Sequence, residues 1–136
     1  MAKKLWDKGI KTDEFIERFT VGRDREMDLK LAEYDVKGTI AHITMLESVG
    51  LLEADELQIL TKELNRILDE VILAGDFEIE DGVEDVHSLI ELMLTRELGD
   101  VGKKVHSGRS RNDQVLVDLK LFLKYELLEI VNLTKN

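Results

Sequence analysis

One run of residues near the end of the chain combines side chains that can bind an anion. Ser107–Gln114 reads Ser-Gly-Arg-Ser-Arg-Asn-Asp-Gln and leads into a long stretch of periodic apolar residues. Ser110 and Asp113 have the spacing of a capping box, which predicts a helix with Ser110 as its N-cap. Arg111 and Asn112 then lie in the first turn, where free N–H groups and the helix dipole favour negative charge. The pattern indicates a site for a carboxylate or a phosphate, with a plain surface cap as the alternative.

The histidines show no spacing typical of a metal site or a catalytic triad. His87 follows Asp85 by two residues, so the two side chains cannot share a helix face. His42 has no acidic residue three or four positions away, which favours a structural role. His106 lies in a basic loop, where we expect it to be exposed to solvent. The sequence has no cysteine, which excludes thiolate ligands and a cysteine nucleophile. The sequence also lacks the spacing of a zinc site, a P-loop or a Rossmann fingerprint, so we predict no metal and no cofactor.

The net charge argues against polyanionic partners. Lysine and arginine number 19 against 29 acidic residues, a net charge of −10, and such a surface repels nucleic acid and anionic lipid. The longest apolar run, Val71–Gly75, is far shorter than the roughly 20 residues of a membrane span. Met1–Lys4 is basic, but no apolar stretch follows, so it is not a secretory signal. We expect a cytoplasmic protein without nucleic-acid or membrane partners.

A basic segment interrupts this acidity just before the predicted helix. Its cations are Lys103, Lys104, Arg109 and Arg111. No acidic residue lies between Lys103 and Asn112, so the predicted anion site sits in a locally positive part of an acidic chain.

Apolar periodicity predicts an all-α fold that must position this site. The predicted helices are a short one from Thr12 to Phe19, one from Leu29 to the cap Gly50, one from Leu57 to Gly75, one from Val86 to Gly99, and a last one from Asn112 to Asn136. Gly38 in the second of these predicts a close helix–helix contact. Asp76–Gly82 is expected to be an extended or irregular connector. The short link before Leu57 predicts that the two helices it joins pack antiparallel.

The last predicted helix carries more apolar residues than one small domain can cover. The side expected to face the domain holds Val115, Leu119 and Phe122, and the residues expected to point away are Leu116, Leu121 and Leu128. Because a contiguous apolar patch is by default a contact site, we expect self-association through this helix as a dimer, or a helix end that folds back or frays.

The run Val105–Val115 closely resembles the first characteristic block of argininosuccinate lyases, within the fumarase/aspartase superfamily. The Gly-Arg-Ser-Arg-Asn-Asp-Gln sequence separates this family from fumarases and adenylosuccinate lyases. Further similar stretches are Lys4–Trp6, Leu31–Val36, Ile40–His42, Glu84–His87 and Leu98–Asp100, so the resemblance covers essentially the whole chain. It implies the helical N-terminal domain of fumarase/aspartase-type lyases over residues 1–111, and the start of a long central-bundle helix over residues 112–136.

The resemblance also implies a reaction and a substrate site. Members split argininosuccinate reversibly into arginine and fumarate, in arginine biosynthesis, as homotetramers without metal or cofactor. A base removes a proton next to a carboxylate, an aci-carboxylate develops and the guanidinium nitrogen departs, so cations and donors are needed where negative charge accumulates. Ser110, Arg111 and Asn112 match substrate-binding positions, and His87 matches a histidine near the same cleft. Asp24 stands where the family has another substrate-binding serine, in the loop before the first long helix.

By the same resemblance, the catalytic groups lie outside this sequence. The family's Thr-His block and its flexible serine loop come further along a longer chain. We therefore expect a truncated N-terminal portion that holds no catalytic residue and is inactive alone. The alternative is a non-catalytic helical structural or interaction protein that kept the lyase fold. A fumarase or aspartase would have a different block at Gly108–Gln114.

Overall fold

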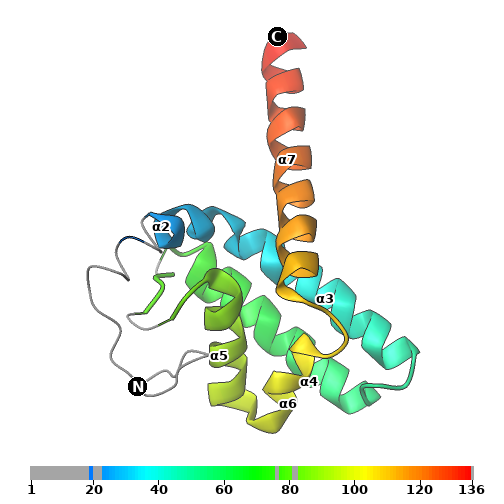
Figure 1. The fold of residues 1–136 in the computed structure, drawn as a ribbon. Coiled ribbons are helices and arrows are strands. Elements are labelled where there is room, and N and C mark those ends of the chain that lie inside the picture. Colours follow the sequence, from blue (N-terminus) through cyan, green and yellow to red (C-terminus); the bar gives the residue numbers. More distant parts are fainter. Residues whose placement is uncertain (1–18, 20–22, 76, 81–82, 136) are drawn as a thin grey trace.

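In the computed structural model, residues 19, 23–75, 77–80 and 83–135 are described, and helices dominate them (Figure 1). In chain order the elements are α2 (Asp24–Asp28), the 3-10 helix η1 (Leu29–Leu31), α3 (Ala32–Ser48), α4 (Ala54–Arg66), the π-helix η2 (Ile67–Ile72), α5 (Val86–Leu98), α6 (Asp100–Lys103), the 3-10 helix η3 (Lys104–His106) and α7 (Arg111–Lys135). No strand occurs in that part of the chain, which confirms the predicted all-α class.

The helix ends follow local signals in the sequence. Asp85 caps α5 by accepting a hydrogen bond from the Ser88 amide at 2.6 Å. Gly99 ends the same helix with a φ of 61°, a left-handed conformation that suits glycine. The predicted ends at Gly50 and Gly75 are confirmed in the same way. The helix predicted up to Gly75 differs in one respect, because its last part is the π-helix η2.

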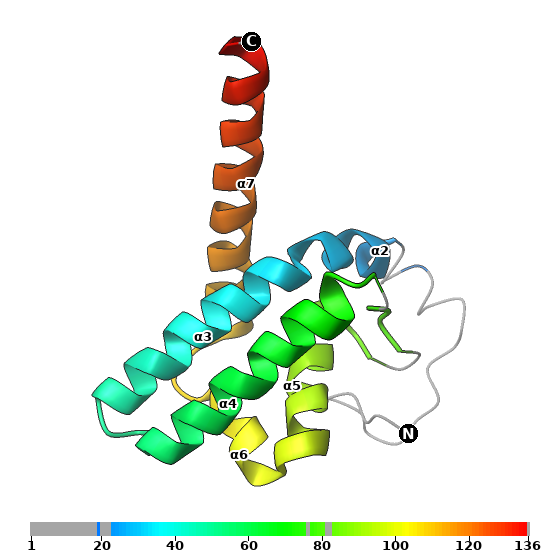
Figure 2. The same cartoon turned by 180° about the vertical axis from the view of Figure 1, so that it is seen from behind.

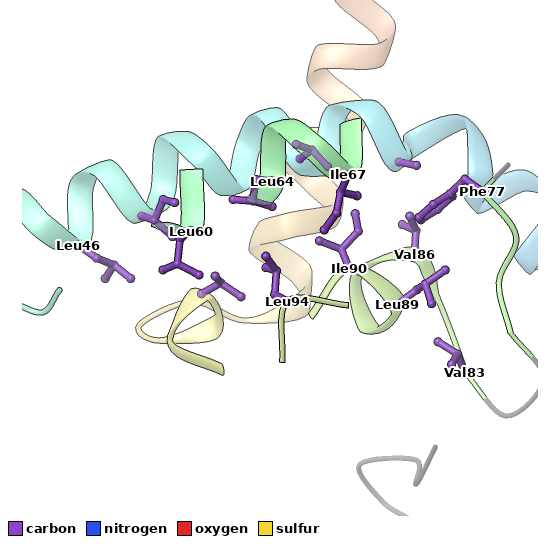
Figure 3. Close-up of a cluster of buried hydrophobic side chains, with 14 of the residues drawn as sticks. Leu46, Leu60, Leu64, Ile67, Phe77, Val83, Val86, Leu89, Ile90 and Leu94 are labelled. Carbon is purple, nitrogen blue, oxygen red and sulfur yellow. The ribbon is translucent and has the colours of Figure 1, made fainter. Parts of the chain in front are cut away.

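The hydrophobic core lies between α3, α4 and α5. Figure 2 shows α3 and α4 side by side, joined at one end by a short turn, as the predicted antiparallel pair requires. A capping box between Glu53 and Glu56 starts α4 after that turn. The core side chains in Figure 3 include Leu46, Leu60, Leu64, Ile67, Ile90 and Leu94, all at most 2% exposed. Each such burial stabilises the fold by about 1.5–3 kcal/mol before entropy is counted.

The predicted orientation of the last helix is confirmed in part: Leu116 and Leu128 are exposed as expected, but polar residues rather than Leu119 lie at the centre of the side that faces the domain. The residues that α7 buries are Gln114 and Asp118, whereas Leu119, expected to face the domain, is 39% exposed. The reason is that the surfaces of α3 and α5 beneath α7 present Asp35 and His87, so polar side chains complement them better than leucine does. Phe122 does contact the domain, with its ring 5.9 Å from that of Tyr34.

The remaining part of α7 projects away from the domain as a straight continuous helix, so the end does not fold back (Figure 1). At the base of α7, the predicted close helix–helix contact at Gly38 is confirmed. A Cβ placed on Gly38 would lie 3.2 Å from Cγ1 of Val117 and 3.4 Å from a carboxylate oxygen of Asp118. Glycine therefore lets α3 and α7 approach closely at this crossing.

Two further expectations change or remain open. The segment expected to be a basic loop contains α6 and η3, and His106 ends η3 half-buried rather than exposed. Asp24 is the first residue of the short helix α2 rather than part of a loop, and its side chain lies outside the described part. The predicted helix from Thr12 also lies outside it, apart from Phe19. Among the described helices, none combines the length and apolar character that crossing a membrane requires.

Candidate functional site

The start of α7 is built by a reciprocal capping box. The Asp113 amide donates to Ser110 Oγ at 3.4 Å, and the Ser110 amide donates to an Asp113 carboxylate oxygen at 2.7 Å. The Ser110 hydroxyl also donates to the Asp113 carboxylate. The hydrogen bond from the Ser110 amide, and after it the one from the hydroxyl, lower the pKa of Asp113. The predicted N-cap is confirmed. The amides of Arg111 and Asn112 precede the first intrahelical hydrogen bond, so they face outward at the positive end of the helix.

Arg111 extends from this turn across the start of α5. Its Nη2 donates to Ser88 Oγ at 3.0 Å, and its Nη1 lies 3.4 Å from Asp85 Oδ1. Glu91 Oε2 is 3.9 Å from Nη2, and the side chain is about a quarter exposed. The guanidinium thus joins the N-terminal ends of α5 and α7 while one side remains accessible. A bound carboxylate would share the Arg111 guanidinium with Asp85 and Glu91.

The basic segment divides into surface and interior cations. Lys103 pairs with Asp100 and Lys104 pairs with Glu56, both across exposed or half-exposed contacts. Such pairs contribute little to stability. Arg109 instead turns inward, where its Nη2 donates to Thr39 Oγ1 of α3 at 2.9 Å. Burial lowers its pKa, and its Nε has no hydrogen-bond partner within the described part.

A buried polar cluster lies directly behind this turn. His87 is 3% exposed, and its Nδ1 lies 2.9 Å from Asp35 Oδ1 and 3.6 Å from Asp118 Oδ2. Gln114 adds a hydrogen bond of 3.4 Å from its Nε2 to Asp35 Oδ1. We call these four residues, Asp35, His87, Gln114 and Asp118, the polar cluster. It connects α3, α5 and α7.

The electrostatics of the polar cluster favour a retained proton. Burial alone would lower the pKa of His87, but the hydrogen bond to Asp35 and the surrounding negative charges raise it overall. Burial first, and then the charge of Asp35, raise the pKa of Asp118 to about 7, against the opposing effects of His87 and Arg109. Asp118 therefore keeps its proton up to a pH of about 7, while Asp35 faces the more readily protonated imidazole of His87 and Arg109 lies nearby.

Within the described part of the chain, three side chains of the polar cluster lie close enough together to hold a metal ion. One ligand atom each from Asp35, His87 and Asp118 lies within 4.8 Å of the others. The contact of 2.9 Å between His87 and Asp35 has the length of a hydrogen bond, however, and the positive charge of Arg109 acts on Asp118. This arrangement fits a buried salt-bridge cluster better than a cation site.

The contribution of the polar cluster to the stability of the chain is expected to fall as the pH rises from about 4 to beyond 7. In the folded chain Asp118 keeps a proton up to a pKa of about 7, which the unfolded chain releases near 4. His87, whose pKa is also raised, contributes stability that is complete below its ordinary value and is lost as the pH passes its folded value. Urea denaturation from about pH 5 to about pH 8 measures the fall.

Asp118→Asn cannot ionise and should flatten this dependence. The contribution of the polar cluster to the free energy of unfolding falls between the acidic and the alkaline measurement. For Asp118→Asn this fall should be smaller than for the unsubstituted chain by about 1 kcal/mol or more. Asp69→Asn, at an exposed aspartate, is the matched control and should leave the dependence as it is. Parallel curves for the unsubstituted chain and Asp118→Asn would contradict the assignment of the proton to Asp118.

The structure brings together most of the predicted site residues but in two layers. Ser110, Arg111 and Asn112 form the accessible layer at the start of α7. His87 lies in the buried layer, facing Asp35, and is not open to a cleft. The sequence interpretation missed Asp118 and Gln114: a spacing of four places them on one helix face, but nothing in the sequence marks that face as the buried one.

A comparison by sequence identifies the family of this helical chain. Residues 7–136 match a lyase family, and the chain belongs to that family. It is similar to proteins named argininosuccinate lyase: 67% identical over 130 residues to that of Phocaeicola vulgatus, 62% over 133 residues to that of Parabacteroides distasonis and 44% over 133 residues to that of Thermotoga neapolitana. These matches cover 96%, 98% and 98% of this chain but 29%, 30% and 33% of the relatives.

Proposed function

We propose that this chain forms part of an argininosuccinate lyase, which releases fumarate and arginine from argininosuccinate in cytoplasmic arginine biosynthesis. The observation that carries the proposal is the start of α7, where a capped turn presents Arg111 and Asn112 with outward amides. The names of the similar proteins support the choice of substrate. In this proposal, residues 1–111 are the N-terminal domain and residues 112–136 open a central helical bundle.

In the proposed reaction, the start of α7 stabilises negative charge on the substrate. Removal of the proton next to a carboxylate moves electrons onto that carboxylate before the guanidinium nitrogen leaves. Arg111 can hold one of its oxygens, and the Asn112 amide can donate to another. The Ser110 hydroxyl, which donates to Asp113 at 3.0 Å, joins them by turning its proton from that carboxylate to the substrate. Donors fixed in advance by a helix stabilise such a transition state without reorganisation. Asp24, which stands where the family has another substrate-binding serine, is proposed as a further neighbour of the substrate.

The proton-abstracting group is proposed to come from outside this sequence. In the described part, His87 is buried against Asp35, and His42 Nε2 is 2.8 Å from the carbonyl oxygen of Ser107. Neither is placed as an accessible base beside Arg111. The chain therefore contributes binding groups, and the remaining catalytic groups belong to the other parts of such an enzyme.

A hybrid enzyme tests this function. The chain replaces the matching 130 residues of the Phocaeicola vulgatus argininosuccinate lyase. We expect the hybrid to release fumarate from argininosuccinate with kcat/KM within about tenfold of the parent, and the isolated 136-residue chain to release none, because the base is missing. Fumarate absorbance measures both.

Two outcomes would contradict the proposal. A hybrid that folds and assembles like the parent but releases no fumarate would favour a non-catalytic structural role for this chain. Release of fumarate by the purified chain alone would show that the base lies within it. Circular dichroism and sedimentation of the hybrid separate loss of chemistry from loss of structure.

We also propose that α7 mediates assembly, as a dimer for the isolated chain and as a tetramer for the whole enzyme. Its outer part exposes large apolar side chains, with exposed fractions between 39% and 75% for Leu116, Leu119, Leu123, Leu127, Leu128, Ile130 and Leu133. A contiguous apolar surface of this kind is a contact site by default. A second copy of the same helix can cover it with a two-fold arrangement.

The assembly prediction is tested by sedimentation equilibrium of the 136-residue chain. We expect a dimer, and we expect the double variant Leu127→Glu with Leu128→Glu to shift it to a monomer, since the charges would be buried in the contact. Leu73→Glu, at an apolar residue 61% exposed but outside α7, is the control and should still dimerise. A monomeric chain at high concentration with α7 fully helical would contradict the prediction.

A further inference from the structure

The first turns of α7 present one continuous polar face to the domain. Arg111, Gln114 and Asp118 are spaced by three and four residues, so they lie on the same side of the helix. Arg111 contacts Ser88 of α5, Gln114 contacts Asp35 of α3, and Asp118 lies beside His87 of α5. A rotation of α7 about its own axis would disturb all three contacts together.

Apolar packing does little to fix this rotation. Among the described residues of α7, only Gln114 and Asp118 are buried, and most of the apolar side chains remain exposed. The ring contact between Phe122 and Tyr34 and the approach of Val117 to Gly38 add to the polar contacts at the base. Directional hydrogen bonds and charges, which lose their energy on small displacements, therefore define the orientation of the helix.

We propose that Asp118 and Gln114 are positioning residues: through the polar cluster they set the rotation of α7 and so aim Arg111 and Asn112 at the substrate carboxylate. The proposal rests on the proposed function for its substrate. Asp118 acts through His87, and Gln114 acts through Asp35. Neither residue touches the substrate itself.

The buried carboxyl groups of Asp35 and Asp118 are better explained by a positioning role than by a contribution to stability. Burying Asp118 and Asp35 together is unfavourable, as the raised pKa of Asp118 indicates, and an apolar pair could fill the same space. Asp118 Oδ2 and Gln114 Oε1 also have no hydrogen-bond partner within the described part of the chain. Such a cluster costs stability, and its retention is explained if the contacts that it does make, from Gln114 to Asp35 and from Asp118 to the charge of His87, hold an adjacent binding turn in place.

Activity of the hybrid gives the first test. Asp118→Asn keeps the shape of the side chain and removes its charge, and Gln114→Leu removes the contact to Asp35. For both variants we expect kcat/KM for argininosuccinate to fall about tenfold to a hundredfold, the effect of a small misplacement of binding groups. Asp69→Asn, the same substitution at an exposed site, should remain unchanged. Values within twofold of the unsubstituted hybrid for both variants, with the fold intact, would overturn the proposal.

Nuclear magnetic resonance of the 136-residue chain gives the second test, which does not depend on activity. His87 is faced by Asp35 from α3, by Asp118 from α7 and by Asp85 from its own helix. Asp118→Asn should therefore lower the pKa of His87 and shift the amide signals of Arg111 and Ser88, whereas Asp69→Asn should do neither. Unchanged signals at Arg111 in both Asp118→Asn and Gln114→Leu would refute positioning. If the unsubstituted hybrid is inactive, the proposed function fails, and this second test still decides the role of Asp118.

Discussion

Replacing Arg111 by alanine in the hybrid enzyme is expected to lower kcat/KM for argininosuccinate by roughly ten- to a hundredfold. The reason is the loss of a charge-assisted hydrogen bond to the substrate carboxylate, which contributes about 1.5–3 kcal/mol. Asn112→Ala should fall in the same range, because its amide donates at the same turn. Steady-state kinetics at matched enzyme concentration measure both effects.

The control for this prediction is a cation of the same basic segment that has a different environment. Lys103→Ala removes a positive charge that pairs with exposed Asp100, so kcat/KM should change less than twofold. Near-parental turnover in both Arg111→Ala and Asn112→Ala would refute the assignment of the anion site. A loss equal to theirs in Lys103→Ala would show that only the overall positive charge matters.

The largest expected effect on stability is at Gly102. A Cβ at this position would lie 2.5 Å from the carbonyl carbon and oxygen of Leu94 and 2.6 Å from the amide nitrogen of Thr95. These are backbone atoms of α5, so they cannot move aside as a side chain would. Gly102→Ala should therefore lower the free energy of unfolding by roughly 3 kcal/mol, at the upper end of overpacking effects. Urea denaturation of the 136-residue chain measures it.

Gly38→Ala is the informative comparison. The new methyl group would contact Cγ1 of Val117 at 3.2 Å, and this side chain can adjust by a few tenths of an ångström. The gain in helix propensity, up to about 1 kcal/mol, offsets the crowding. We expect a change much smaller than at Gly102. A loss of less than about 1 kcal/mol for Gly102→Ala would mean that α6 moves away from α5 without cost.

Features that depend on neighbouring residues could be predicted from the sequence. The ends of α5 follow from the Asp85 cap and from Gly99, which are both local signals. The start of α7 follows from Ser110 and Asp113, three residues apart. Such signals act within one helical turn, so their effect does not depend on the rest of the fold. The place of Arg111 and Asn112 in the first turn of α7 could be predicted for the same reason, and the binding of an anion there stays a prediction.

The pairing of particular polar residues from distant parts of the chain could not be predicted. Asp35 and His87 are 52 positions apart, and Asp35 and Gln114 are 79 apart, so no spacing rule connects them. The last helix has apolar residues on several sides, and its own sequence does not say which side faces the domain. That choice is made by the charges on α3 and α5, which select Gln114 and Asp118 over Leu119.

The polar contacts at the base of α7 also act at a distance, because a helix is stiff. From Asp118 to Lys135 the helix extends about 25 Å, so a tilt of about 10° at Asp118 displaces its far end by about 4 Å, most of one helical pitch. A small change in orientation at the base of α7 is therefore amplified at its far end. A substitution at the base, or a change in protonation there, would displace the exposed apolar side chains of α7 through which we propose that the chain assembles.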